Sequence, residues 1–187
     1  MGSPASAAPK LVTGEELYRM GDLGRCELID GRIVTMSPTG QEHGGVEVNF
    51  GAALKAFVRE RGLGHVRVGE VGIYTRRNPD RVRGADALYI SNERYACRQR
   101  QRGYLDVAPE IVVEVLSPDD RSSDLRDKIA EYFAIGVRLL WIADPERRRI
   151  AVHMDGHLVA ELGEGDSLSG DDVLPGFEVA VAELFED

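Results

Sequence analysis

The sequence contains few cysteines and no long apolar run, and each shortage excludes a class of protein. Its two cysteines, Cys26 and Cys97, match no metal-binding or redox spacing, so we expect reduced thiols in a cytoplasmic protein. No apolar run approaches the length of a membrane span. Residues 1–9 have neither a basic start nor an apolar core. They predict a loose tail, ending at about residue 10, rather than a signal peptide.

Aromatic residues are also scarce, at 6% of the chain, which predicts a mostly aliphatic core. The 187 residues are 43% hydrophobic and 29% charged, which is typical of a globular protein. The length suits one domain, which we place at residues 11–187.

The net charge of −9 argues against a general nucleic-acid coat protein and against a polybasic membrane-binding protein. The charge is unevenly distributed, however. Residues 59–102 contain 11 arginines, no lysine and five acidic residues, a net charge of +6. The densest cluster is Arg94, Arg98, Arg100 and Arg102. Arginine side chains suit phosphate, so these four are candidate nucleic-acid contacts. A solvated loop, or a loop that docks on an acidic partner, explains the same pattern.

Hydrophobic periodicity predicts a mixed α/β fold with a sheet flanked by about two major helices. Thr13 and Glu16 fit a capping box before a short helix, and Asp30-Gly31 predicts a hairpin. We expect longer helices over 42–61 and 124–135, and a long polar loop after residue 90. The expected strands cover 65–75 with a bend at Gly69 or Gly72, 86–90, 111–116, 138–143, and a hairpin of 150–154 with 157–162. A capping segment ends in a short turn at 181–185.

Two acidic residues stand alone in apolar strands. Glu114 is the only charge in 111–116 and by alternation shares a face with Val112 and Leu116. Asp86 stands at the head of the expected strand 86–90. A buried carboxylate needs a cation or hydrogen bonds, so an ion pair or a helix cap explains Glu114, and a turn hydrogen bond explains Asp86. Two such acids on neighbouring strands also describe a Mg²⁺ or Mn²⁺ site.

Lys128 is one of only three lysines, against 20 arginines. It flanks the apolar face of the expected helix 124–135, where its ammonium could meet a carboxylate or a phosphate. A surface pair with Asp124, four residues earlier, is the alternative.

Several motifs, in this order along the chain, resemble the Uma-two family of restriction endonuclease-like proteins. They are Glu27-Leu-Ile-Asp-Gly, Met36-Ser-Pro, Glu42-His43, Asp86, Ala108-Pro-Glu-Ile-Val-Val-Glu-Val-Leu-Ser-Pro118, Asp124-Leu-Arg-Asp-Lys-Ile-Ala-Glu-Tyr132, Gly136-Val-Arg-Leu-Leu-Trp-Ile-Ala-Asp-Pro145 and Leu174-Pro-Gly-Phe177. The resemblance spans roughly residues 13–185. That family belongs to the PD-(D/E)XK nuclease superfamily, so the resemblance implies a restriction-endonuclease-like core of mixed sheet flanked by helices.

The resemblance also implies functional residues. Asp86 and Glu114 match the two metal-binding acids of the superfamily motif. Ala85 stands where a proline is usual, and Leu116 stands where the motif lysine is expected. Lys128 fits a lysine supplied by the following helix. Glu27 resembles a further acid of the family, with an ion pair in the hairpin as the alternative. His43 fits a general base or a phosphate contact, or an ordinary capping or core histidine.

The resulting hypothesis is a Mg²⁺- or Mn²⁺-dependent endonuclease that hydrolyses phosphodiester bonds, with DNA as the expected partner. We expect no membrane and no small-molecule cofactor. A homodimer would let identical sites cut both strands. One alternative is a catalytically inactive nuclease fold that binds nucleic acid or a protein partner. Another is a structural or regulatory domain of a larger assembly.

Overall fold

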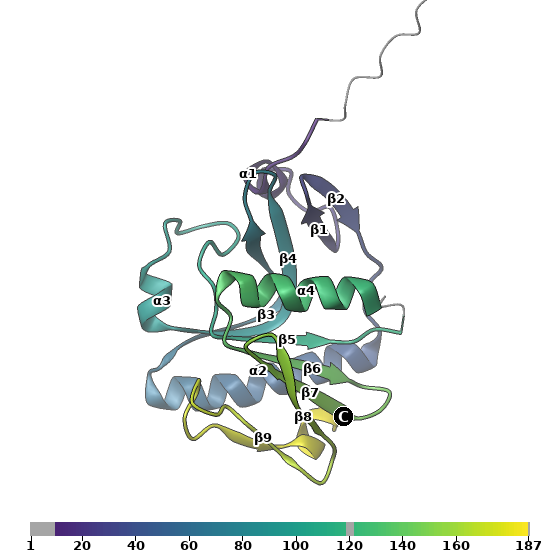
Figure 1. The fold of residues 1–187 in the computed structure, drawn as a ribbon, viewed down its shortest axis with the longest axis vertical. Helices are drawn as coiled ribbons and strands as arrows, with labels where there is room; N and C mark the ends of the chain where they lie inside the picture. Colours follow the sequence, from purple (N-terminus) through teal and green to yellow (C-terminus); the bar gives the residue numbers. More distant parts are fainter. Residues whose placement is uncertain (1–9, 119–121, 187) are drawn as a thin grey trace, which may run out of the picture.

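A mixed sheet of eight strands forms the centre of the computed structural model (Figure 1), which describes residues 10–118 and 122–186. The predicted tail at residues 1–9 lies outside the described residues. The strand order is β2-β1-β4-β5-β6-β7-β8, and β3 pairs along the whole length of β4. Only the β5–β6 pairing is parallel among the described strands. The predicted mixed α/β fold is therefore confirmed, whereas the single domain over 11–187 stays a prediction.

The bounds of the elements follow the chain. The sheet contains β1 (Cys26–Ile29), β2 (Arg32–Thr35), β3 (Gly64–Arg76), β4 (Arg81–Ser91), β5 (Ile111–Val115), β6 (Leu139–Asp144), β7 (Arg149–Met154) and β8 (His157–Leu162). The helices are α1 (Gly14–Arg19), α2 (Gln41–Arg61), α3 (Asn92–Ala96) and α4 (Ser122–Ile135). A small second sheet pairs β9 (Ser167–Ser169) with β10 (Glu178–Ala180), followed by a 3₁₀ helix, η1 (Val181–Phe185).

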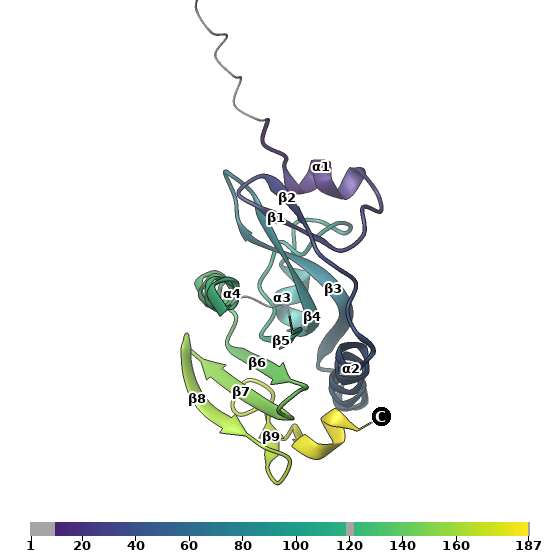
Figure 2. The same ribbon diagram turned by 90° about the vertical axis from the view of Figure 1, so that its right-hand side faces the viewer.

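Helices α2 and α4 lie on opposite faces of the sheet, as Figure 2 shows. Phe50 and Leu54 of α2 belong to one buried cluster, which includes Trp141 of β6. Tyr132 of α4 belongs to a second cluster, with Val112 of β5. Strand alternation therefore separates the two cores, because successive side chains point to opposite faces. It also places Glu114 on the α4 face, as predicted.

The predicted start of one strand is wrong. β4 begins at Arg81, not at Asp86, so Asp86 lies in the middle of an eleven-residue strand. The sequence pattern failed here because Arg81 and Arg83 are charged and yet buried or nearly so. Acidic side chains neutralise both: Glu131 pairs with each of them. A strand that is charged in sequence can therefore be central in the sheet.

The expected polar loop after residue 90 is also partly wrong, because it begins with the short helix α3. The Ser91 side chain accepts a hydrogen bond from the Arg94 backbone nitrogen and so caps this helix. The capping segment near the end of the chain likewise contains β9 and β10. The remaining predicted helices and hairpins are confirmed, with small shifts at their ends.

A β-bulge in β3 lies beside the candidate site and orients one of its acidic side chains. The register with β4 shifts between Val68 and Val71, and Gly69 and Glu70 have φ values of 91° and 54°. Glycine tolerates this backbone region, which confirms the predicted bend at Gly69. The bulge lies opposite Asp86 and turns the Glu70 carboxylate toward it.

Among the described residues, the structure contains no helix that is both long and apolar enough to span a membrane.

Candidate active site

Asp86 lies where strands β4 and β5 separate. The last backbone pair on this side joins Ala87 to Val113. Beyond it, the Asp86 Oδ2 atom accepts a hydrogen bond from the Val115 backbone nitrogen at 2.7 Å. The Asp86 carboxylate thus accepts a hydrogen bond that a backbone carbonyl of a paired strand would otherwise accept. Asp86 is almost fully buried. It is thereby held beside the residue that follows Glu114.

His43 and Glu47 approach Asp86 from the first turns of α2. His43 Nε2 lies 3.4 Å from Asp86 Oδ2. One potential ligand atom from each of the three residues lies within 4.8 Å of the others. Their spacing of four residues places the two α2 side chains on one helix face. That spacing is the signal from which Glu47 could have been found, although our sequence analysis did not select it.

The charges of this cluster suit a cation. Burial and the Asp86 charge raise the pKa of Glu47. Burial by itself would raise the pKa of Asp86, but hydrogen bonding to His43 outweighs it and lowers that pKa. His43 is buried, and its Nδ1 atom has no hydrogen-bond partner among the described residues. One nitrogen and two carboxylate donors form a ligand set for a divalent ion such as Mn²⁺ or Mg²⁺.

Glu70 adds a third carboxylate beside Asp86. Burial raises its pKa first, and the Asp86 charge raises it further. Arg25 forms an ion pair with Glu70 and partly offsets this repulsion. The site therefore contains more negative charge than its local cations neutralise.

Glu114 lies on the α4 side of the same strand junction. Its Oε1 atom accepts a hydrogen bond from the Tyr132 hydroxyl at 2.6 Å, and its Oε2 atom lies 2.9 Å from Lys128 Nζ. Burial raises the pKa of Glu114 to about 7, with Lys128 acting against it and Asp86 adding to it. The Asp86 charge is therefore one cause of the raised pKa of Glu114. That they bind a common metal ion stays a prediction.

Lys128 points inward and not toward Asp124. Its Nζ atom lies 2.9 Å from Glu114 and 3.2 Å from Glu27. Burial alone would lower the pKa of Lys128, but these two carboxylates outweigh burial and raise it. The ammonium therefore stays charged at neutral pH. Asp124 instead pairs with Arg83.

Arg83 forms the base of this arrangement and is only 2% exposed. Its guanidinium contacts Glu27 at 2.7 Å, Asp124 at 3.0 Å and Glu131 at 2.9 Å. Glu27 also accepts a hydrogen bond from the Gly84 backbone nitrogen at 3.1 Å. Arg83 thus orients Glu27, which in turn contacts Lys128. Glu27 therefore forms ion pairs with Arg83 of β4 and Lys128 of α4, and among the described residues it forms none within its own hairpin.

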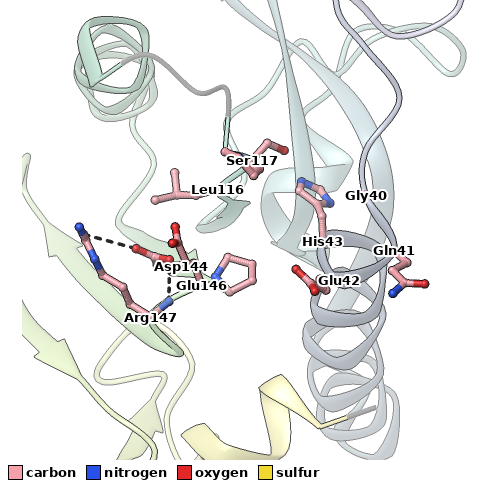
Figure 3. Close-up of a pocket in the computed structure, with 11 residues that line it drawn as sticks. Gly40, Gln41, Glu42, His43, Leu116, Ser117, Asp144, Glu146 and Arg147 are labelled. Atoms are coloured by element: carbon pink, nitrogen blue, oxygen red, sulfur yellow. Dashed lines mark hydrogen bonds and ion pairs between the residues drawn. The ribbon is translucent and has the colours of Figure 1, made fainter.

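A pocket of about 560 Å³ opens beside His43. It lies between the first turn of α2, the end of β5 and the end of β6 (Figure 3). Its acidic lining residues are Glu42, Asp144 and Glu146, and Arg147 is paired with Asp144. His43 is the member of the cluster that lines the pocket, so the pocket gives solvent and ligands a route to it.

The four predicted arginine contacts do not lie in one environment. Arg94 Nη1 donates to the Ala108, Pro109 and Gly136 carbonyls, and its Nε atom lies 3.3 Å from Glu110. Arg100 pairs with Glu15. Arg98 stacks on Tyr95, whereas Arg102 lines a small cleft near Tyr104. Their contact with nucleic acid stays a prediction.

The structure thus brings the predicted residues into two adjoining groups. Glu27, Glu114 and Lys128 lie together on the α4 side, and His43 lies with Asp86 on the α2 side. The sequence analysis did not select Glu47, Glu70, Arg83 or Tyr132. Nothing in the sequence marks Glu70, because only the bulge turns it toward Asp86.

Comparisons with known proteins agree with this architecture. Residues 14–182 match the model of the Uma2 family, whose description is "Putative restriction endonuclease". A crystal structure from Anabaena variabilis, described as a putative nuclease belonging to DUF820, has a similar fold. The TM-score is 0.76 at 16% sequence identity, over 93% of this chain and 97% of that chain. A comparison with curated proteins finds no match.

Proposed function

This chain belongs to the Uma2 family of restriction endonuclease-like proteins, and on that premise we propose that it is a metal-dependent nuclease that hydrolyses phosphodiester bonds in DNA. The observation that carries the proposal is the position of Lys128. The superfamily motif expects a lysine two residues after Glu114, where this chain has Leu116. Helix α4 supplies an ammonium to the same carboxylate at 2.9 Å. This contact supports the hypothesis that the lysine has moved to the helix.

Asp86 and Glu114 are the proposed metal ligands, with His43 and Glu47 as further donors from α2. The mutual repulsion of the acids supports this assignment, because Asp86 raises the pKa of both Glu47 and Glu114. When bound there, Mg²⁺ or Mn²⁺ would acidify a water molecule and offset charge on the phosphate. An imidazole donor favours Mn²⁺ more than an all-oxygen site does.

Lys128 is proposed to stabilise negative charge that develops on the phosphate. Its raised pKa keeps it protonated, so it acts as a fixed cation or hydrogen-bond donor and not as a base. Glu27 and Arg83 position it: Arg83 holds Glu27, and Glu27 lies 3.2 Å from the ammonium. Tyr132 orients the Glu114 carboxylate through its 2.6 Å hydrogen bond.

DNA as substrate and a homodimer as the assembly are parts of the same proposal. A two-fold dimer would present identical sites to the two strands of a duplex. Light scattering at micromolar concentration tests the dimer, and a mass equal to one chain would contradict it. A comparison of duplex DNA, single-stranded DNA and RNA of matched sequence tests the substrate.

Cleavage of labelled DNA in the presence of Mg²⁺ or Mn²⁺ is the direct test. We expect cleavage by the wild type, with none in Asp86→Asn, in Glu114→Gln or with excess chelator. Arg126, exposed on α4, offers a matched control, because Arg126→Ala removes a charge near Lys128 without touching the site. Cleavage that persists in both acid variants would contradict the proposed site.

Metal binding can be measured without activity. At a Mn²⁺ concentration of about 100 times the dissociation constant, binding to the folded state adds about 2.7 kcal/mol of stability. We therefore expect a rise in melting temperature that Asp86→Asn removes and Arg126→Ala retains. A rise in melting temperature and DNA binding without cleavage would favour the inactive nuclease fold.

A further inference from the structure

A group of cationic side chains surrounds Tyr95 at one edge of the sheet. Tyr95 belongs to α3, and its ring centroid lies 3.9 Å from that of His65 in β3. The guanidinium carbon of Arg98 lies 3.6 Å from the Tyr95 ring centroid, and that of Arg67 lies 5.7 Å from it. Figure 1 shows α3 beside the β3 end of the sheet. We call Lys55, His65, Arg67 and Arg98, with Tyr95, the Tyr95 platform.

The positive charges of the platform lie close enough to His65 to affect its pKa. The pKa of His65 is lowered, first by burial and then by the charges of Arg67, Arg98 and Lys55. Lys55 is exposed on α2, so the platform joins three elements: α2, β3 and α3 with the residues that follow it. At neutral pH His65 is uncharged and the platform has a charge of about +3.

Within residues 10–118 and 122–186, none of these cations forms an ion pair with an acid. Arg67 donates to the Val66 carbonyl at 3.0 Å, and Arg98 donates to the Tyr95 carbonyl. The Arg98 Nε atom is buried and has no hydrogen-bond partner among the residues that the structure describes. Arg94 and Arg100 are different, since they pair with Glu110 and Glu15. In a chain with a net charge of −9, an unpaired group of cations points to an external anion.

Two members of the platform, His65 and Arg67, lie on β3, the strand that also contains Glu70 of the candidate active site. Arg67 is opposite Leu88 in the register, and Glu70, which contacts Asp86, follows Arg67 by three residues. Three residues of a strand span at most about 10 Å, and the bulge at Gly69 and Glu70 shortens this path. That upper limit equals about three nucleotide steps of ~3.4 Å rise along one strand. A DNA strand with a phosphate at Asp86 would therefore pass over the platform a few nucleotides away.

We propose that the Tyr95 platform binds the phosphate backbone of the DNA that this protein cuts, an inference that rests on the proposed function. Phosphate is favoured over a stacked base because Arg98 and His65 already cover the Tyr95 ring. The ring fixes the Arg98 guanidinium plane, and the guanidinium N–H groups that are neither buried nor bonded to the Tyr95 carbonyl can donate to phosphate. The predicted contact Arg98 belongs to this platform, whereas Lys55, His65 and Arg67 are new.

The affinity for a labelled duplex of about 20 base pairs tests the platform. Fluorescence anisotropy in chelator, at several salt concentrations, measures binding without cleavage. We expect Arg67→Ala with Arg98→Ala to weaken binding by about 10- to 100-fold at low salt. Because each lost phosphate contact lowers the slope of log affinity against log salt by ~0.9, the double variant should lower it by about 2. Lys55→Glu, at an exposed helix position, gives a second variant that should fold normally and weaken binding about 10-fold.

Arg32→Ala is the matched control, since Arg32 is exposed in β2 and has no ion pair among the described residues, and Figure 1 shows β2 away from α3. We expect its affinity to stay within about twofold of wild type. Unchanged affinity and salt slope in both the double variant and Lys55→Glu would overturn the inference. So would a change only in self-association, which would mean that the charges protect the strand edge from pairing. Binding to an acidic polypeptide but not to DNA would also overturn it.

The two proposals can fail separately. If wild type binds DNA through the platform but does not cleave it with either metal, the platform stands and the nuclease activity does not. If wild type cleaves DNA and the platform variants bind as wild type does, the nuclease proposal stands and the platform does not.

Discussion

Two groups of cations in this protein have opposite surroundings. Beneath α4, Arg83 is buried, the Lys128 side chain is only 14% exposed, and each contacts at least two carboxylates. Around Tyr95, Arg67 and Arg98 are only partly buried and form no ion pair among the described residues. We call the first group the α4 network: Glu27, Arg83, Glu114, Asp124, Lys128 and Glu131.

The difference teaches how a cation's surroundings limit its role. A buried cation with acidic partners is needed for stability, because its loss leaves charges without compensation. A partly exposed cation without a partner adds little to stability but remains available to an anion. Changes in the α4 network should therefore affect folding or turnover, and changes in the Tyr95 platform should affect binding.

The largest effect is expected at Arg83. Arg83→Met leaves Glu27 and Glu131 without their buried partner, so the free energy of unfolding should fall by about 3–5 kcal/mol. Chemical denaturation measures this loss. Arg67→Ala is the comparison in the Tyr95 platform, and it should change stability by no more than about 0.5 kcal/mol. Similar losses in the two variants would remove the distinction between the two groups.

Lys128 should affect turnover more than binding. Lys128→Ala should lower the cleavage rate by about 10²- to 10³-fold, as expected when a group that stabilises transition-state charge is lost. Affinity for DNA should change by only a few-fold. Lys128→Arg should not restore the rate, because the planar guanidinium does not fit a site built for a compact ammonium. A cleavage rate near wild type in Lys128→Ala would exclude this role for Lys128. Other groups, such as Glu27 or His43, would then activate the attacking water molecule. The Arg126→Ala variant controls for the loss of charge on α4.

Glu131 should make stability depend on pH. Burial by itself would raise the pKa of Glu131, but its hydrogen bonds and the charge of Arg83 lower it below the ordinary 4.5. The stabilisation is therefore present above pH 4.5 and is lost as the pH falls through the lowered pKa. Glu131→Gln should cost about 2 kcal/mol at neutral pH, the value of a charge-assisted hydrogen bond, and less in acid. Chemical denaturation at several pH values measures the difference, and an equal loss at all of them would exclude a charge effect.

The smallest effect is expected at Arg100, two residues from Arg98. Arg100 pairs with Glu15, so Arg100→Ala should change DNA affinity by less than about twofold. Arg98→Ala alone should weaken it several-fold. The same anisotropy titration compares the two single variants. Equal losses of DNA affinity would mean that the whole arginine cluster contacts DNA. Pairing with an acid would then not distinguish the two groups of cations.

Much of the fold could be predicted from local patterns. The Thr13–Glu16 capping box, the Asp30-Gly31 turn and the apolar stripe of α2 all appear in the structure. These features depend on neighbouring residues, so periodicity and turn chemistry reveal them. Arg81 and Arg83 misled the prediction of β4, because their partners come from distant segments.

The candidate site was predictable only in part. Glu114 and Asp86 stand out in sequence as lone acids in apolar strands, Lys128 stands out as a rare lysine, and the family resemblance added Glu27 and His43. Glu47 was detectable from its helical spacing to His43, but Glu70 was not. The Tyr95 platform was also hidden, since Lys55, Arg67 and Arg98 are far apart in the chain.

The sequence by itself determined most of the segments that form helices and strands and which isolated acids needed an explanation, because both depend on local chemistry. The tertiary structure alone decided which charges face each other. It turned Lys128 toward Glu114 and away from Asp124, and it used Arg94 and Arg100 in internal contacts. Within the described part of the chain, it left Arg67 and Arg98 beside the Tyr95 ring and without an acidic partner. The physical reason is that electrostatic energy depends on distance and burial, and packing sets both.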